Sequence, residues 1–242
     1  MVWNVGRKEK ESGPEDPWRR SRPVEKEERQ MEGIQSDDAL LIVDVQNDFC
    51  PGGALPVPEG DAVVPLINQL SRLFRVVGAT QDWHPEGHVS FAGSHPGKKP
   101  TETVLWEGRE QVLWPDHCVQ GSRGADLHPA LDTRPLRFIL RKGIRPGMDS
   151  YSGFLENDHK TTTGLSGLLR ELGVRRILVA GLATDFCVRA TVLDGIETGF
   201  RVAVLLDACR GVDIPAGNVK KALEEMKAKG ARILETKALS AG

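Results

Sequence analysis

The stretch Ala39-Leu-Leu-Ile-Val-Asp-Val45 decides the fold of this chain. A short, continuous run of apolar residues is typical of a strand that is buried on both faces of a parallel sheet. One carboxylate, Asp44, interrupts the run near its end. A buried carboxylate is costly unless it is paired or hydrogen-bonded, so Asp44 has a structural or a catalytic role, and its position alone leaves both open.

Strand-like and helix-like segments alternate on the C-terminal side of this stretch. Further strands are expected at Arg75–Thr80, Arg137–Arg141, Arg176–Ala180, Arg201–Leu206 and Arg232–Leu234. Helices are expected at Ala62–Leu73, Leu165–Glu171, Thr184–Glu197 and Ala216–Lys229. The alternation predicts a three-layer α/β/α fold, in which helices cover both faces of a mostly parallel six-stranded sheet. Residues 82–135 follow neither pattern, and a connection this long inside a compact domain is usually functional.

Residues 1–38 differ in composition from the rest of the chain. Charges of both signs are interspersed with prolines over the first thirty positions, and apolar periodicity is missing. Such a segment cannot bury enough apolar surface to offset its conformational entropy. We therefore expect a disordered extension over residues 1–38 and a single domain over residues 39–242. Met31 is a candidate start, a hypothesis that the intact mass of natively expressed protein would test.

The composition argues against several classes of partner. The formal net charge of −2 provides no basic surplus for binding nucleic acid. No apolar run is long enough to span a membrane, and the N-terminus has no signal-peptide core. The four cysteines form no CxxC pair, which favours reduced thiols. We expect a cytoplasmic protein that binds neither nucleic acid nor membrane, and a homo-oligomer is compatible with its sequence.

Three reactive side chains lie at or just after the ends of expected strands. In open parallel sheets the site lies beyond the carboxyl ends of the strands. Asp44, Lys142 and Cys187 fit that position, although each alone could be a structural carboxylate, an exposed lysine or a buried cysteine. Together they indicate an amidase centre. A helix N-terminus and an ammonium group favour a thiolate, and a carboxylate can pass the thiol proton to a leaving amine.

A second group combines one carboxylate with three imidazoles. It consists of Asp82-Trp-His84-Pro-Glu-Gly-His88, followed later by His117. Asp82 and His84 are two residues apart and point the same way in an extended chain. This donor set suits a borderline divalent ion such as zinc, iron or manganese, while the alternative is a polar loop with surface histidines. The remaining histidines have no such spacing and are expected at the surface: His95, His128 and His159.

Several of these motifs together resemble the nicotinamidase/pyrazinamidase family of the isochorismatase-like hydrolase superfamily. The resemblance spans roughly residues 39–237 and keeps the order of the family's motifs. It rests on Val43-Asp-Val-Gln-Asn-Asp-Phe-Cys-Pro-Gly-Gly53, Gln81-Asp-Trp-His-Pro-Glu-Gly-His-Val-Ser-Phe91, Trp114-Pro-Asp-His-Cys-Val-Gln-Gly121, Arg141-Lys-Gly143, Asp149-Ser-Tyr-Ser-Gly-Phe154 and Gly181-Leu-Ala-Thr-Asp-Phe-Cys-Val188. It implies the Rossmann-like fold of these hydrolases.

The resemblance also implies roles for individual residues. The residues that match the catalytic triad are Asp44, Lys142 and Cys187. The residues that match the ligands of one divalent metal ion are Asp82, His84, His88 and His117, with zinc as the expected ion and iron or manganese as alternatives. Phe49 and Trp114 match the residues that sandwich a pyridine ring. Leu182–Ala183 matches a non-proline cis peptide, beside which the amides of Ala183 and Cys187 form an oxyanion hole.

The activity implied by the resemblance is nicotinamidase activity. This would be metal-dependent hydrolysis of nicotinamide, and of pyrazinamide-type amides, through a cysteine thioester, in NAD salvage. Alternatives are an amidase of the same superfamily for another N-heterocyclic amide, or a metal- or partner-binding protein with a decayed site. A flavodoxin-like carrier would need a phosphate-binding loop after the first strand, where this chain has Gln46-Asn-Asp-Phe-Cys-Pro51.

Overall fold

The computed structural model of this chain describes residues 33–239. Most of the expected N-terminal extension, residues 1–32, therefore lies outside the described residues. The end of that segment belongs to the domain, because the first strand begins at Asp38 and the Arg175 amide donates to Asp37 O at 2.9 Å. The domain thus starts a few residues before the expected boundary at residue 39.

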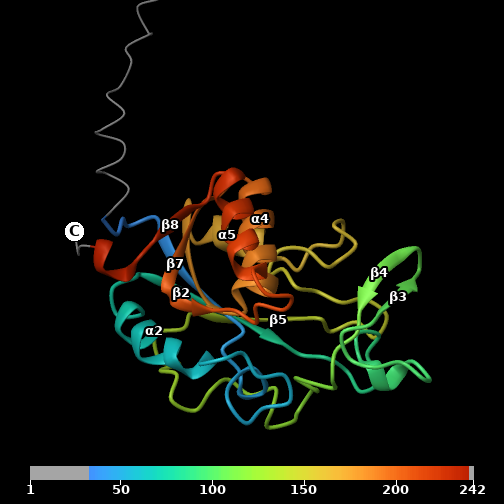
Figure 1. The fold of residues 1–242 in the computed structure, drawn as a ribbon. Coiled ribbons are helices and arrows are strands. Elements are labelled where there is room, and N and C mark those ends of the chain that lie inside the picture. Colours follow the sequence, from blue (N-terminus) through green and yellow to red (C-terminus); the bar gives the residue numbers. More distant parts are fainter. Residues whose placement is uncertain (1–32, 240–242) are drawn as a thin grey trace, which may run out of the picture. The chain divides into compact units, whose positions relative to one another are not determined.

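Six strands form one parallel sheet, as predicted (Figure 1). Their order across the sheet is β5-β2-β1-β6-β7-β8, and every neighbouring pair is parallel. The strands are β1 (Asp38–Val43), β2 (Val76–Asp82), β5 (Phe138–Lys142), β6 (Arg176–Leu182), β7 (Arg201–Arg210) and β8 (Arg232–Leu234). All residues of β1, β2 and β6 are buried, which explains the apolar run at the start of the domain.

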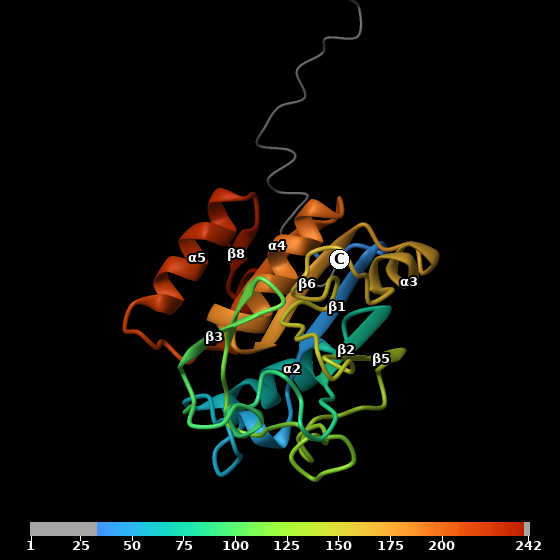
Figure 2. The ribbon, with the colours of Figure 1, turned by 90° about the vertical axis from the view of Figure 1, so that its right-hand side faces the viewer.

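Helices cover both faces of the sheet, which confirms the three-layer prediction (Figure 2). Alternate β1 residues pack into two separate hydrophobic clusters, Leu40 and Ile42 into one and Leu41 and Val43 into the other. The first cluster includes the apolar side of α2 (Val64–Leu70). The second cluster includes apolar residues of α3 (Leu165–Glu171), α4 (Arg189–Glu197) and α5 (Asn218–Ala228).

Two expected helices are partly replaced by other turns. The 3₁₀ turn Gly60–Val63 precedes α2, and the π-helical turn Thr184–Val188 precedes α4. The other 3₁₀ turns are short: Asn47–Phe49, Ala92–Ser94 and Thr236–Ala238. π-helical turns are frequent at functional sites, and this one follows the central strand β6 directly.

Residues 82–135 contain a β-hairpin that the sequence did not predict. Its antiparallel strands are β3 (Thr103–Trp106) and β4 (Arg109–Val112). The turn residues Glu107 and Gly108 both have positive φ, 47° and 78°, as a tight two-residue hairpin requires. The hairpin is mostly exposed, so its sequence shows no apolar alternation that would mark the strands.

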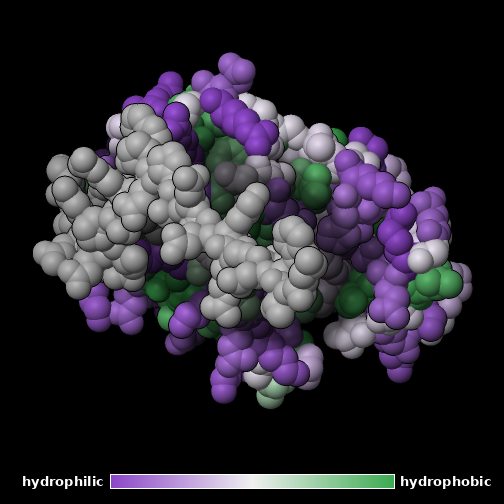
Figure 3. All heavy atoms as spheres, turned by 90° about the horizontal axis from the view of Figure 1, so that it is seen from above, coloured by the Kyte–Doolittle hydropathy of each residue, from purple (hydrophilic) through white to green (hydrophobic). Residues whose placement is uncertain are grey.

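None of the helices in the described part of the chain is long and apolar enough to cross a membrane. The face seen in Figure 3 is mostly hydrophilic outside the grey atoms, and its hydrophobic patches are small and separate.

One glycine allows the two central strands to approach each other near their carboxyl ends. Gly181 has a φ of 122°, and a Cβ atom there would lie 2.1 Å from the carbonyl oxygen of Val43. Since that neighbour is backbone, it cannot move without disturbing the β1–β6 pairing.

We therefore predict that Gly181→Ala lowers the free energy of unfolding by about 3 kcal/mol or more, measured by urea denaturation. Gly167→Ala is the matched control. Gly167 lies on the exposed side of α3 with no atom within 4 Å of an added Cβ, and the change should stabilise the protein by about 0.5–1 kcal/mol. Equal effects of the two substitutions would contradict this account.

Candidate active site

The carboxyl ends of four adjacent strands place the reactive side chains at one edge of the sheet. Asp44 follows β1, and Cys187 lies in the turn after β6. Asp82 and Lys142, the last residues of β2 and β5, are register partners in the sheet. These four residues are far apart in sequence and meet because their strands are neighbours.

Lys142 connects these groups through its ammonium. The side chain is fully buried, with Nζ 2.9 Å from Asp44 Oδ2 and 3.5 Å from Cys187 Sγ. It also donates hydrogen bonds to Asp82 Oδ1 and, at 2.9 Å, to the carbonyl oxygen of Ser150. One buried cation thus contacts both carboxylates and the thiol.

The two carboxylates have different protonation behaviour. Burial raises the pKa of Asp44, and although Lys142 lowers it, the pKa stays above its ordinary value. Burial also raises the pKa of Asp82, but Lys142 and His84 outweigh this effect and hold that pKa well below the ordinary value. Asp82 is therefore the permanent anion of the pair, and Asp44 is the more basic carboxylate and the better proton acceptor.

The Cys187 thiol is protonated at rest, which differs from the expectation of a favoured thiolate. Burial raises the pKa of Cys187 well above its ordinary value, and the nearby Lys142 only partly opposes this. A carboxylate oxygen of Asp44, one of Asp82 and Cys187 Sγ all lie within 4.8 Å of one another. A proton acceptor is thus within reach of the thiol, and the thiol needs one to become a nucleophile.

Three of the four predicted metal ligands form one compact group. Donor atoms of Asp82, His84 and His117 lie within 4.8 Å of one another, and all three side chains are buried. The Nδ1–H of His84 donates to Gly143 O at 2.9 Å, and that of His117 donates to Pro115 O at 2.8 Å. These hydrogen bonds leave the Nε2 atoms facing Asp82 Oδ2 at 3.6 and 3.9 Å. Histidine ligands of metals are held in this way, so the group fits a divalent ion.

The fourth predicted ligand, His88, belongs to a neighbouring group. Its ring stacks on that of His84 with 4.2 Å between centroids, and its donor atom lies within 4.8 Å of those of His84 and Asp149. The Nε2–H of His88 donates to Met148 O at 3.1 Å. The four predicted metal ligands are therefore distributed over two groups of side chains, and His84 belongs to both. Asp149 was not among the predicted site residues, although it lies in one of the motifs.

The imidazoles of His88 and His117 are neutral. Burial and the neighbouring His84 lower the pKa of both, to about 4 for His117. Burial also lowers the pKa of His84, but Asp82 outweighs it and the pKa rises. Neutral His117 keeps a free lone pair on Nε2, as a metal ion requires. Both ring nitrogens of His88 are engaged in this structure, Nε2 by Met148 O and Nδ1 by the Ser90 amide.

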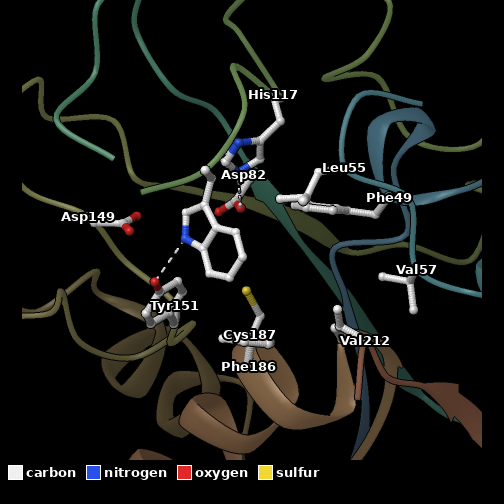
Figure 4. Close-up of a pocket in the computed structure, with 12 residues that line it drawn as sticks. Phe49, Leu55, Val57, Asp82, His117, Asp149, Tyr151, Phe186, Cys187 and Val212 are labelled. Carbon is white, nitrogen blue, oxygen red and sulfur yellow. Dashed lines mark hydrogen bonds and ion pairs between the residues drawn. The ribbon is translucent and has the colours of Figure 1, made fainter. Parts of the chain in front are cut away.

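A cavity opens between the thiol and the metal-ligand group (Figure 4). In this view Asp82 and His117 lie at one end of the cavity, Cys187 lies at the other, and Phe49 lies to one side. The two predicted ring-binding residues, Phe49 and Trp114, both line it. The sequence did not predict several other lining residues, which are Leu55, Val57, Asp149, Tyr151, Phe186 and Val212. A mostly apolar cavity with few polar groups at its ends is typical of a site for a small molecule.

The backbone beside Cys187 has the conformation that the resemblance implied. The Leu182–Ala183 peptide is cis, and Ala183 and Cys187 both line the cavity. The amides of Phe186 and Val188 donate to Ala183 O at 3.1 Å each and close the turn that carries the thiol.

Asp185 ties this turn to the loop after β7. Its carboxylate accepts hydrogen bonds from the amides of Val212 and Asp213 and from Asn218 Nδ2, each at 3.0 Å. Val212 is thereby held in the cavity wall next to the turn that bears Cys187.

Gln46 supports the metal-ligand end of the site. Its fully buried side chain accepts the Asp82 N–H at 2.8 Å and donates to both Asp82 O and Ala125 O at 2.8 Å. The amide therefore holds the backbone of Asp82 from both sides. The neighbouring Asp48 accepts the amide of Cys118 at 2.7 Å and so fixes the loop that bears His117.

The comparisons with known proteins agree with this geometry. Residues 38–238 match the family described as Isochorismatase domain. A nicotinamidase of Acinetobacter baylyi is 46% identical over 199 residues, which cover 82% of this chain and 92% of that protein. A nicotinamidase of Escherichia coli is 47% identical over 200 residues, which cover 81% of this chain and 93% of that protein.

Solved structures of similar proteins have the same fold. A nicotinamidase/pyrazinamidase of Acinetobacter baumanii has a TM-score of 0.82 at 46% identity, covering 84% of this chain and 98% of that one. A protein of L. infantum in complex with nicotinate has a TM-score of 0.76 at 41% identity, covering 87% and 98%. A pyrazinamidase of Pyrococcus horikoshii in complex with zinc has a TM-score of 0.68 at 40% identity, covering 82% and 99%.

We predict that Gln46→Glu destabilises the protein by at least about 2 kcal/mol, because a carboxylate would face the buried carbonyls of Asp82 and Ala125. Gln120→Glu is the matched control. Gln120 is exposed and also donates to a backbone carbonyl, Trp83 O at 2.9 Å, but solvent can replace that bond. Thermal unfolding of both variants measures the difference, and an equally small effect at both sites would contradict the role given to Gln46.

Proposed function

The chain belongs to the isochorismatase-domain family and, within it, to the nicotinamidase/pyrazinamidase group, and we propose on this premise that it hydrolyses nicotinamide to nicotinate and ammonia. One observation carries the proposal beyond the likeness to named nicotinamidases. A thiol with its own base and cation, Cys187 with Asp44 and Lys142, faces an aromatic-walled cavity that ends at a metal-ligand group. Such a cavity suits a flat ring with an amide at one end and a metal-binding atom at the other.

The amide bond is cleaved through a thioester in this proposal. As Cys187 Sγ attacks the carboxamide carbon, its proton passes to Asp44, which has the raised pKa of the two carboxylates. The C–N bond then breaks, and the Asp44 proton moves to the departing nitrogen to give ammonia. Water attacks the thioester with Asp44 as base, and this step releases nicotinate and restores the thiol. Lys142 remains charged throughout and stabilises the thiolate and both carboxylates.

The carboxamide oxygen becomes negatively charged during both attacks. The amides of Ala183 and Cys187, in the cavity wall beside the thiol, are the proposed donors to it. Preorganised donors of this kind contribute a large part of the rate because they need no reorientation in the transition state.

A divalent ion is the proposed cofactor, held by Asp82, His84 and His117 with His88 and Asp149 beside them. When bound, it supplies a Lewis acid that a pyridine nitrogen can bind. Zinc is the favoured ion, since the related pyrazinamidase of Pyrococcus horikoshii was solved in complex with zinc. Phe49 and Trp114 hold the faces of the ring, and this role does not depend on the metal.

Pyrazinamide is a second proposed substrate, because related proteins are named pyrazinamidases and its ring also has a nitrogen meta to the carboxamide, where nicotinamide has its ring nitrogen. NAD salvage is the proposed setting of the reaction, since nicotinate is its product. A cytoplasmic location and a homo-oligomeric state stay predictions.

We predict that the purified protein releases ammonia and nicotinate from nicotinamide in equal amounts, and that Cys187→Ala lowers turnover at least about 1,000-fold. Cys209→Ala is the control, since Cys209 is equally buried but lies in the hydrophobic core outside the cavity. It should keep most of the activity. Substantial turnover by Cys187→Ala would rule out the covalent mechanism.

The metal proposal has its own test. His84→Ala should lose most of the bound metal found in the wild type by elemental analysis and should raise the KM for nicotinamide, while Cys187→Ala keeps its metal. His159→Asn, at an exposed histidine with positive φ that asparagine tolerates, should leave the metal content unchanged. Chelation should abolish ammonia release and added zinc should restore it. Full activity of a metal-free protein would contradict the role given to the ion.

A further inference from the structure

Tyr151 is a cavity residue to which the proposed mechanism gives no role. It is the only tyrosine in the chain. Figure 4 shows Tyr151 and Phe49 on either side of Cys187, so the phenol ring belongs to the wall that faces the predicted ring-binding phenylalanine.

The Tyr151 hydroxyl holds the other ring-binding residue. Trp114 Nε1–H donates to Tyr151 Oη at 3.0 Å, the hydrogen bond drawn in Figure 4. Phe186 also contacts the indole edge-on, with 5.1 Å between centroids and 89° between planes. One contact fixes the nitrogen edge of the indole, and the other limits its tilt. Without the hydrogen bond, the ring would keep the edge-on contact but lose the anchor that sets its rotation.

The hydroxyl is itself held in place by the loop that follows β5. The Tyr151 amide donates to Asn157 Oδ1 at 3.0 Å. The preceding residues are also fixed, because Ser150 O accepts from Lys142 Nζ at 2.9 Å and Asp149 Oδ2 accepts from Gln111 Nε2 at 2.9 Å. The loop that carries Tyr151 is therefore held against the charged centre of the site, and the Tyr151 hydroxyl can hold the indole of Trp114 in one orientation.

We propose that Tyr151 is a positioning residue: by accepting the Trp114 N–H, it fixes the plane on which the flat ring of the substrate stacks, and so sets the affinity for N-heteroaromatic amides. This inference rests on the proposed function. It assigns Tyr151 to ring binding and not to bond cleavage, since its hydroxyl is engaged by Trp114 and the proton transfers belong to Asp44.

Tyr151→Phe removes the hydroxyl and keeps the ring. The KM for nicotinamide should rise about 2- to 12-fold, the range that corresponds to the net contribution of one hydrogen bond, while kcat stays within about twofold. The dissociation constant of nicotinate, measured by calorimetric titration, should rise by the same factor. An unchanged KM, or a loss confined to kcat, would overturn the inference.

A double substitution separates positioning from direct contact with the substrate. Trp114→Phe removes the N–H donor, so adding Tyr151→Phe to it should cause no further rise in KM. If the effects of the two substitutions multiply, the hydroxyl acts on the substrate itself and the inference is wrong.

Trp106→Phe is the matched control. Trp106 Nε1 donates to Gly147 O at 3.1 Å, which is the same kind of bond to the same loop, but Trp106 is outside the cavity. This variant should keep the KM of the wild type, and a rise like that of Tyr151→Phe would contradict the inference.

A wild type that is inactive on nicotinamide overturns the proposed function and the inference together. An active wild type with an unaffected Tyr151→Phe variant overturns only the inference.

Discussion

The contact of one buried ammonium with two carboxylates is the interaction on which the site depends. Lys142 Nζ lies against Asp44 and Asp82 in a region closed to solvent, where an unpaired charge would cost several kcal/mol. Two carboxylates and one ammonium leave an excess of one negative charge. Burial is the main cause of the raised pKa of Asp44, and the negative charge of Asp82 raises it further. A divalent ion beside Asp82 would offset the same excess of charge. The charge balance therefore links the metal-ligand group to the proton acceptor of the thiol.

The sheet brings these charged groups together and also fixes the distances between them. Asp82 and Lys142 are register partners, so their separation is set by strand spacing and not by flexible loops. Gly181 permits the backbone of β6 to approach Val43, the residue just before Asp44. The turn that bears the thiol begins at Thr184, three residues beyond Gly181. A small error in strand pairing would separate the base from the nucleophile, and the strands that lead to Asp44, Asp82 and Cys187, which are β1, β2 and β6, are buried along their whole length.

The sequence predicted the parts of the site that depend on strand ends and missed those that depend on loop packing. The six strands and the meeting of Asp44, Lys142 and Cys187 follow from apolar runs and from the rule that parallel strands end at one edge. Leu55 and Val57 lie in the loop before α2 and Val212 lies in the loop after β7, and an apolar loop residue has no local signal of its partners. The division of the metal ligands could not be predicted either, because it depends on the hydrogen bond from His88 to Met148 O across the fold. From the nearby lysine and the helix N-terminus, the sequence favoured a thiolate at Cys187. It could not show that burial is the largest influence on the pKa of this thiol and raises it.

In the proposed reaction, the same charge arrangement would favour release of the product over its retention. Nicotinamide is neutral, and its amide can enter the space next to Asp44 at no electrostatic cost. Hydrolysis converts the amide to a carboxylate within reach of Asp44, and like charges at short range in a poorly solvated site repel each other strongly. Lys142 offsets part of this repulsion, but its charge already faces Asp44 and Asp82. The product is thus destabilised at one end of the cavity, while the aromatic walls hold its ring as they held that of the substrate. In the proposed reaction, the change of charge at the reacting group would therefore oppose retention of the product.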